Sequence, residues 1–355
     1  MSAPFSSPPG SRIASTLYSQ EEQQQPYSPY TGTIQEEENL DTKPTQTVPP
    51  PRASRSLNFY RSISWILGFH ERWSLLNCLI WGGAMVGFSL ARSVTMNPSK
   101  LPGLLVPGEW FWFKAPLYKV NLLIHIYLTI LGGIGAIFQF FPAIRRRYIA
   151  LHRLNGYGVL FCLIVGNICG SIVGRRSFGG ELNVQSAYYI LGIMVVYSGL
   201  LGIYNVKRDT RRHRKWMLRM VVYFSVVVTA RLIMLASAAI ITDLKTYFSI
   251  WRCDEVLNLL TDAEALQRLY PQCLADGVNT AQVWVAVHAS NNEGPLGEAS
   301  ALRAVTGMAL WIATLMHMAG VECYIIMTEH ANQVRLGFAL EPLDLTEDNN
   351  KSSSY

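Results

Sequence analysis

The sequence is poor in charged residues and lacks the common motifs of soluble enzymes. Lys, Arg, Asp and Glu together make up 15% of the 355 residues, whereas a soluble domain usually has about 25%. The sequence contains no P-loop, no GxSxG, no HExxH and no GxGxxG followed by an acidic residue. Its six cysteines form no CxxC pair and no Cys/His spacing of the kind that binds zinc. These absences argue against the usual nucleotide-binding and hydrolytic enzymes, and we expect no metal site.

Long apolar stretches are what the sequence has instead. Hydrophobic residues make up 50% of the chain, and apolar runs occur at six places. Each run reaches the roughly 20 residues needed to cross about 30 Å of hydrocarbon. The runs are residues 73–91, 117–141, 154–174, 186–204, 216–241 and 305–327. The sequence therefore predicts an all-α fold, an integral membrane bundle of six transmembrane helices in contact with the lipid bilayer. It does not distinguish the plasma membrane from an endomembrane.

Basic residues gather at every second junction between these runs. The junction after the second run, 145–153, and the junction after the fourth, 207–215, are both dense in Arg and Lys. Under the positive-inside rule both junctions face the cytosol, so both termini are expected there too. This distribution explains the net charge of +6 without a nucleic-acid partner, which we do not expect. The loops 92–116, 175–185 and 242–304 then fall on the opposite face.

The segments before the first span and after the last one differ from the bundle in composition. Residues 1–57 are rich in Ser, Pro and Gln and bury too little apolar surface to offset their chain entropy, so we predict a disordered cytosolic tail. Because this tail lacks an apolar h-region, we expect the first span to act as both signal and anchor. Residues 58–72 mix aromatic and aliphatic side chains with Arg61, which suits a helix in the membrane interface. Residues 328–355 are predicted to be a second cytosolic tail.

The loop 242–304 is too long and too rich in aromatic residues for a simple connection between spans one to five (73–241) and span six. It contains a stretch with helical character at 254–269. We predict a small cap over the non-cytosolic mouth of the bundle. Cys253 and Cys273 lie in this loop, and we expect them to form a disulfide if the loop faces an oxidising compartment.

Two short motifs at the basic junctions point to a known family. One is His-Arg-x-x-Gly at residues 152–156, and the other is His-Arg-x-Trp-Met-x-Arg at residues 213–219. This pair resembles a family of bacterial and fungal predicted membrane proteins that is known only as a domain of unknown function. The resemblance covers roughly residues 117–241, and the intramembrane residues Arg231 and Glu322 also fit it. It implies a multi-pass membrane fold and no particular activity, while the loop 242–304 and the N-terminal tail look like fungal additions.

A few polar side chains inside the predicted spans are the candidates for function, because burying such groups in a membrane is expensive. From a rise of about 1.5 Å per residue, we expect His125, Asn167, Arg231 and His317 in one layer of the outer half of the bilayer. Glu322 lies nearer the cytosolic end of its span. We predict a polar pocket centred on Arg231, His125 and His317 that binds or converts a small hydrophobic or anionic metabolite. The guanidinium would bind an anion, while the two histidines and Glu322 are candidates for proton transfer.

Two other interpretations stay open. Six spans with histidines near both faces are similar to the cytochrome b561 architecture, which implies b-type haem on His125 and His317 and a second haem on His152 and His213. Against this alternative, His152 and His213 lie in basic sequence at the membrane edge, and the fourth span has no histidine. The other possibility is a non-catalytic transporter, receptor or scaffold, in which the polar side chains serve only as hydrogen-bonded contacts between helices.

Overall fold

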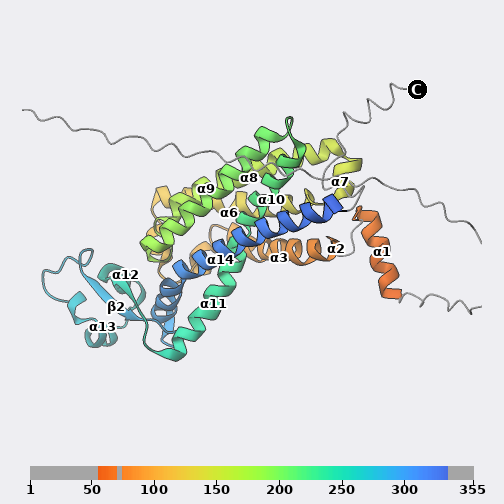
Figure 1. Ribbon diagram of the computed structural model, residues 1–355. Helices are drawn as coiled ribbons and strands as arrows, with labels where there is room; N and C mark the ends of the chain where they lie inside the picture. Colours follow the sequence, from red (N-terminus) through yellow and green to blue (C-terminus); the bar gives the residue numbers. More distant parts are fainter. Residues whose placement is uncertain (1–54, 70–73, 335–355) are drawn as a thin grey trace, which may run out of the picture. The chain divides into compact units, whose positions relative to one another are not determined.

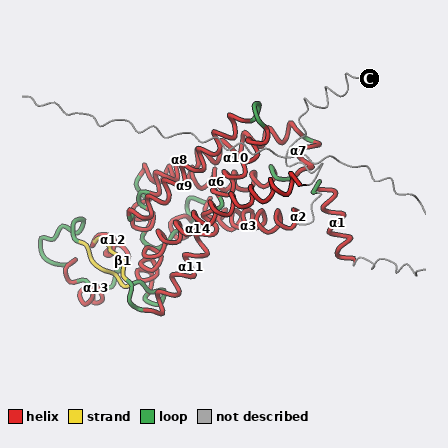
Figure 2. Tube along the Cα trace, in the orientation of Figure 1, coloured by secondary structure: helices red, strands yellow, loops and turns green. Residues whose placement is uncertain are grey.

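The computed structural model describes residues 55–69 and 74–334 of the chain. The tails predicted at 1–57 and 328–355 lie mostly outside this part. The described chain is mostly helical, with two short strands outside the bundle, as Figures 1 and 2 show. Ahead of the first span, α1 (Arg55–Leu67) exposes Phe59, Trp65 and Ile66, as a helix in the membrane interface would.

Six helical segments of the described chain are long and apolar enough to cross a membrane, so the predicted multi-pass bundle is confirmed. The first combines α2 (Ser74–Asn77), the π-helical turn η1 (Cys78–Gly82), α3 (Gly83–Arg92) and η2 (Ser93–Met96). The next three are α6 (Pro116–Phe138), α8 (Ile149–Gly174) and α9 (Leu182–Asn205). The fifth is α10 (Thr210–Phe224) continued by α11 (Val226–Leu244), and the sixth is α14 (Gly294–Val334).

Prolines and capping residues set several of the helix ends. Pro116 is the first residue of α6, where its missing N–H is not needed and its fixed φ suits a helix. Pro142 likewise begins the short helix α7 (Pro142–Arg147), which carries the first three arginines of the first basic junction. Asp209 caps α10, because its side chain accepts a hydrogen bond from the backbone N–H of Arg212. Most residues of each basic junction therefore lie in helices, with breaks at Tyr148 and at 206–209, and α6 ends at Phe138 rather than at 141.

Close contact between α6 and α8 depends on glycines that face the partner helix. A Cβ on Gly132 would lie 2.7 Å from Cδ2 of Leu163, and one on Gly166 would lie 3.0 Å from Cγ2 of Thr129. Such distances are too short for ordinary carbon contacts, so a larger residue at either position would push the two helices apart. Membrane helices associate largely through close packing of this kind, because lipid tails are as apolar as the side chains.

The connection between the fifth and sixth spans is folded. An antiparallel hairpin pairs β1 (Phe248–Arg252) with β2 (Trp284–His288), and between these strands lie α12 (Cys253–Leu259), α13 (Ala263–Leu269) and the 3₁₀ turn η4 (Pro271–Cys273). Figure 2 shows the two strands in yellow. The helical stretch expected at 254–269 is thus two short helices, and the hairpin was not predicted. The last helix already begins at Gly294, so residues 294–304 belong to α14 rather than to the cap.

Two links hold the cap together and join it to the bundle. Cys253 and Cys273 are joined by a disulfide, with their Cα atoms 5.3 Å apart. Arg303 of α14 pairs with Glu255 of α12 through an Nη2–Oε2 distance of 2.6 Å, and the two side chains are only 6% and 3% exposed. Trp112, in α5 (Glu109–Phe113), donates to the other oxygen of Glu255 at 3.0 Å. Because both carboxylate oxygens have donors, the cost of burying this charge is offset.

Candidate functional site

A cavity of about 260 Å³ lies inside the bundle. Its wall comes from every span except α14, together with η2, α4 (Leu101–Leu104), α5 and η3 (Ser177–Gly180). The wall is mostly apolar and includes the rings of Phe88, Phe113, Phe178 and Phe224. Its charged and titratable members are Arg92, Glu109, His125, Tyr188 and Arg231, and Asn167 and several Ser and Thr residues also line it. No residue of 242–304 lines the cavity, so the expected cap does not itself enclose it; the connections after spans one and three do.

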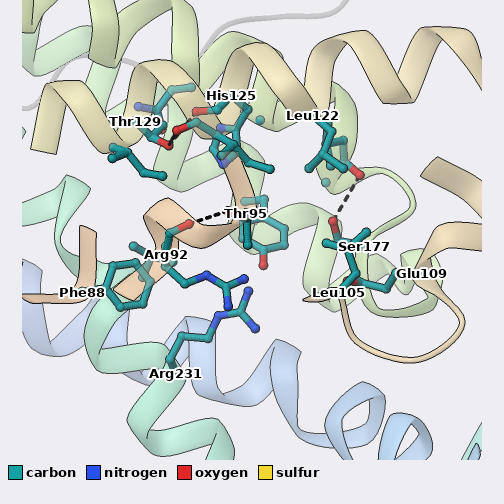
Figure 3. A pocket seen from close by; sticks show the side chains of 18 of the residues that line it. Phe88, Arg92, Thr95, Leu105, Glu109, Leu122, His125, Thr129, Ser177 and Arg231 are labelled. Carbon is teal, nitrogen blue, oxygen red and sulfur yellow. Dashed lines mark hydrogen bonds between the residues drawn. The ribbon is translucent and has the colours of Figure 1, made fainter. Parts of the chain in front are cut away.

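Arg92 and Arg231 bring two positive charges into this cavity. Arg92 is the last residue of α3, and Arg231 lies in the first half of α11. Figure 3 shows their guanidinium groups side by side, and they are close enough for the charge of Arg231 to act on Arg92. Within residues 55–69 and 74–334, no carboxylate is at ion-pair distance from either group. Two partly buried cations repel each other, and an anion placed between them would relieve this repulsion. The planar fork of arginine also suits carboxylates and phosphates in particular.

Glu109 is the acidic residue of the cavity wall. Its Oε1 accepts a hydrogen bond from the backbone N–H of Phe178 at 3.1 Å. Phe178 has the left-handed φ of 48°, which is uncommon for a residue with a side chain, and its ring centroid lies 5.1 Å from Cζ of Arg231. Burial raises the pKa of Glu109, although the Phe178 amide and the nearby arginines act to lower it. Glu109 therefore holds a proton more readily than an ordinary glutamate.

His125 lines the cavity from α6. Its Nδ1 lies 2.8 Å from the carbonyl oxygen of Gly166. Because a carbonyl oxygen only accepts, Nδ1 carries the proton and Nε2 keeps its lone pair. The ring lies directly over Gly170, where a Cβ would be 2.6 Å from Nδ1. Asn167, on the same helix α8, also lines the cavity and donates to the carbonyl of Leu163 at 2.6 Å. The structure thus brings His125, Asn167 and Arg231 to one cavity.

His317 lies elsewhere, at the break between α10 and α11. Its Nδ1 donates to the carbonyl oxygen of Val222 at 2.8 Å, and its Nε2 accepts from the hydroxyl of Thr229 at 2.8 Å. The hydroxyl of Ser225, the residue between the two helices, also donates to the Val222 carbonyl at 2.7 Å. Both ring nitrogens of His317 therefore join α14 to the interrupted helix, and the structure does not place this residue in the predicted pocket.

Glu322 is also outside the cavity and pairs with Arg219 rather than with Arg231. Its two oxygens accept from Nε and Nη2 of Arg219 at 2.6 and 2.7 Å. The guanidinium of Arg219 lies in turn 4.6 Å from the ring centroid of Trp216. Arg219 and Trp216 belong to the second junction motif, so this part of the motif fastens α10 to α14.

His152 and His213 lie near the starts of α8 and α10, at the basic end of the bundle and away from the cavity. Nδ1 of His213 donates to the carbonyl oxygen of Gly202 at 2.8 Å, which fastens α10 to α9. Nδ1 of His152 is buried and has no hydrogen-bond partner in the described part of the chain. The structure assigns neither histidine to the site that contains Arg231.

His125 and His317 do not fit the first haem of the haem alternative as their side chains are placed. Ligation by two histidines requires each to offer one ring nitrogen to the same iron atom. His317 uses both ring nitrogens in hydrogen bonds and lies outside the cavity that His125 lines. Among the described residues, no group of three or more His, Cys, Asp and Glu side chains is placed to hold a metal ion.

Three titratable residues of the cavity wall are absent from the sequence-based candidates: Arg92, Glu109 and Tyr188. The predicted first span ends at residue 91, which leaves Arg92 in a loop, whereas the structure continues that span to Met96. Glu109 lies in a connection without periodic pattern, so only the tertiary structure brings it to the arginines. Tyr188 follows the start of α9, where a tyrosine is ordinary for a membrane interface. The sequence held one signal for these three residues, the position of Arg92 directly after the first apolar run.

Comparisons with known proteins agree with this architecture. Residues 122–255, which contain His125, Arg231 and both junction motifs, match the family described as predicted membrane protein (DUF2306). The chain is also 25% identical over 313 residues to Ava biosynthesis cluster protein G of Aspergillus versicolor, which covers 73% of this chain and 90% of that relative. No solved structure matches the chain. The predicted resemblance is therefore confirmed: this is a multi-pass membrane protein whose segment 122–255 is similar to the DUF2306 family.

Proposed function

We propose that the cavity binds a small lipophilic anion between Arg92 and Arg231. The observation that supports this proposal is the pair of guanidinium groups, side by side in the cavity and without a bonded carboxylate among the described residues. A carboxylate or phosphate between them would accept charge-assisted hydrogen bonds from both sides. It would also offset the cost of holding two like charges inside a membrane protein.

The rest of the wall favours an apolar body on this anion. Phenylalanine rings from α3, α5, η3 and α10 line the cavity, and aliphatic side chains fill much of the remaining wall. A volume of about 260 Å³ is slightly below the roughly 300–1,000 Å³ of pockets for drug-sized ligands. The ligand is thus a small metabolite with an apolar or aromatic part. The relative named as a biosynthesis cluster protein supports a metabolite over an inorganic ion.

Calorimetric titration of the full-length protein in lipid nanodiscs tests this proposal. Benzoate is the probe, and benzamide is its control, since it has nearly the same shape and no charge. Phenyl phosphate tests whether the site accepts a phosphate as well as a carboxylate. We expect saturable binding of benzoate, phenyl phosphate or both, and none of benzamide. Equal binding of benzoate and benzamide, or no binding of either anion, would overturn the proposal.

Proton transfer by His125 is a second candidate function. The observation that favours it is the Nδ1–Gly166 hydrogen bond, which leaves the Nε2 lone pair available to act as a base in the cavity wall. An enzyme of this kind would exchange an acidic C–H proton of a bound keto acid. Deuterium incorporation into phenylpyruvate, followed by NMR, measures this exchange. The expected result is exchange faster than in protein-free buffer and lost in His125→Gln; equal rates would eliminate the enzymatic candidate.

We also propose that both termini face the cytosol and that the cap faces the opposite compartment. The two basic junctions favour this orientation. The Cys253–Cys273 disulfide supports it independently, because disulfides persist in oxidising compartments and not in the cytosol. Protease treatment of sealed membrane vesicles, with an epitope tag on each terminus, tests the orientation. Protection of both tags in vesicles with the cytosolic face outward would contradict it.

A further inference from the structure

Glu109 sits among cations that come from several helices. Arg92 of α3, Arg231 of α11 and Arg303 of α14 all act on its charge. The charged and titratable groups around it are Arg92, Arg231, Arg303, Arg176, Tyr188 and His125. Among these, Arg176 and Arg303 share with Glu109 a second cavity of about 10 Å³, and His125 and Tyr188 share the main one.

None of these cations is bonded to Glu109 in the described part of the chain. Arg303, which is close enough to act on it, is already committed to Glu255 at 2.6 Å and to the carbonyl of Ile250 at 2.9 Å. Among the described residues, the one hydrogen bond to the Glu109 carboxylate comes from the Phe178 amide and goes to Oε1. Oε2 therefore remains available to take a proton, and the carboxylate acts on the arginine pair only through its charge.

An anion bound between Arg92 and Arg231 would compete with this internal carboxylate. It would place a second negative charge near Glu109, and a neighbouring like charge favours the protonated form of a carboxyl group. Burial acts in the same direction and already raises the pKa of Glu109. By thermodynamic reciprocity, protonation of Glu109 must strengthen anion binding by the same factor.

We infer that Glu109 is a proton-binding site coupled to the anion site, so that the cavity takes up one proton with each anion. This inference rests on the proposed function. The proton comes from water and forms an O–H bond at Oε2; no other bond forms or breaks. With two arginines and one carboxylate the empty cavity has a charge of +1, and with two arginines, one monoanion and a neutral Glu109 the loaded cavity also has +1. Loading then changes no net charge inside the membrane protein, where an uncompensated charge is costly.

Calorimetry of benzoate binding tests this coupling on the full-length protein in nanodiscs. Titrations at one pH in buffers with different heats of ionisation give the number of protons taken up for each benzoate bound. Repeating them from pH about 5 to 8 covers the range in which a buried carboxyl group titrates. We expect net proton uptake and an affinity that falls as the pH rises, by up to about tenfold per pH unit for one coupled proton.

The Glu109→Gln variant locates the proton. Its amide oxygen can still accept the hydrogen bond from Phe178, and its side chain cannot titrate. We expect benzoate binding by this variant to be independent of pH and free of proton uptake. The His125→Gln variant is the matched comparison, because it removes the other titratable base of the cavity wall; here the proton uptake should persist.

The possible results separate the two claims. Benzoate binding by the wild type without proton uptake would overturn the coupling and leave the anion site intact. Proton uptake that persists in Glu109→Gln, or that disappears in His125→Gln alone, would assign the proton to another group and also overturn it. A wild type that binds neither benzoate nor phenyl phosphate at any pH would overturn the anion site, and the coupling with it. If Glu109→Gln does not fold, the wild-type titrations in different buffers still test whether a proton is taken up with benzoate. The His125→Gln titrations then test whether His125, instead of Glu109, takes that proton.

Discussion

Arg92, at the end of α3, and Arg231, in α11, place their guanidinium groups side by side in one cavity (Figure 3). The two helices belong to the first and fifth spans, so only the folded bundle creates this pair. The nearby carboxylate, Glu109, acts on both arginines without bonding to either. This relationship is the basis of the proposed anion site.

Gly170→Ala should disturb the anion site from the neighbouring helix. An added Cβ would lie 2.6 Å from Nδ1 of His125, so either the ring moves or α6 and α8 separate, at a cost of about 1–3 kcal/mol for overpacking. We expect a lower melting temperature and weaker benzoate binding, measured in nanodiscs. Gly158→Ala on the same helix is the control, because a Cβ there meets no atom within 4 Å. Equal effects of the two substitutions would contradict the packing argument.

Glu322→Gln should weaken the bundle without affecting the ligand. The substitution removes the ion pair with Arg219, which joins α10 to α14 outside the cavity. Because Glu322 is 44% exposed, we expect a modest fall in melting temperature and an unchanged benzoate affinity. A folded variant that no longer binds benzoate would return Glu322 to the list of site residues.

Loss of the Cys253–Cys273 bond should be visible on a gel and in the stability of the cap. Reduction is expected to change the electrophoretic mobility of the wild type and not that of Cys253→Ser. A bridge of this kind contributes about 2–4 kcal/mol, so the variant's cap should be cut faster by added protease. Cys323→Ser removes a free thiol and is the control; it should retain the mobility change. A wild type without any change on reduction would contradict the disulfide.

Removing the buried partner of Arg303 should loosen the cap. Glu255→Gln leaves the Arg303 guanidinium buried without its counter-charge, and breaking such a pair typically costs about 3–5 kcal/mol. We expect a large fall in melting temperature by intrinsic fluorescence. Glu264→Gln, at an exposed position of α13, serves as the control and should change little. A small effect at both positions would show that the pair does not hold the cap to α14.

The fold could be predicted from the sequence because its dominant signal is local. Each span is a run of apolar residues about as long as the bilayer is thick, and length and composition suffice to find such a run. The hairpin of 248–252 and 284–288 could not be found in this way, because its strands are five residues each and their partners are distant in the chain. The break at Ser225 leaves no mark in hydropathy either, since the residues directly before and after it, 220–224 and 226–230, are mostly apolar.

The site was only partly predictable for a related reason. Depth along a span can be counted from the sequence, and that count brought His125, Asn167 and Arg231 to one level. The direction of a side chain around its helix cannot be counted, and His317 points at the break beside Ser225 instead of into the cavity. Glu109 required the path of the connection after the first span, which is irregular and set by tertiary contacts. Arg92 was missed because the predicted span ends at residue 91, one residue before it.

The most direct measurement of the central claim is the benzoate affinity of three proteins in nanodiscs: the wild type, Arg231→Leu and Leu232→Ala. Leu232 is the matched control, because it follows Arg231 on the same helix and is 67% exposed at the outer surface of the bundle. Loss of one partner from a buried charge pair costs at least about 2 kcal/mol, which is about 30-fold in affinity. We predict a loss of that size in Arg231→Leu and wild-type affinity in Leu232→Ala. Wild-type affinity in a folded Arg231→Leu would contradict an anion site between Arg92 and Arg231.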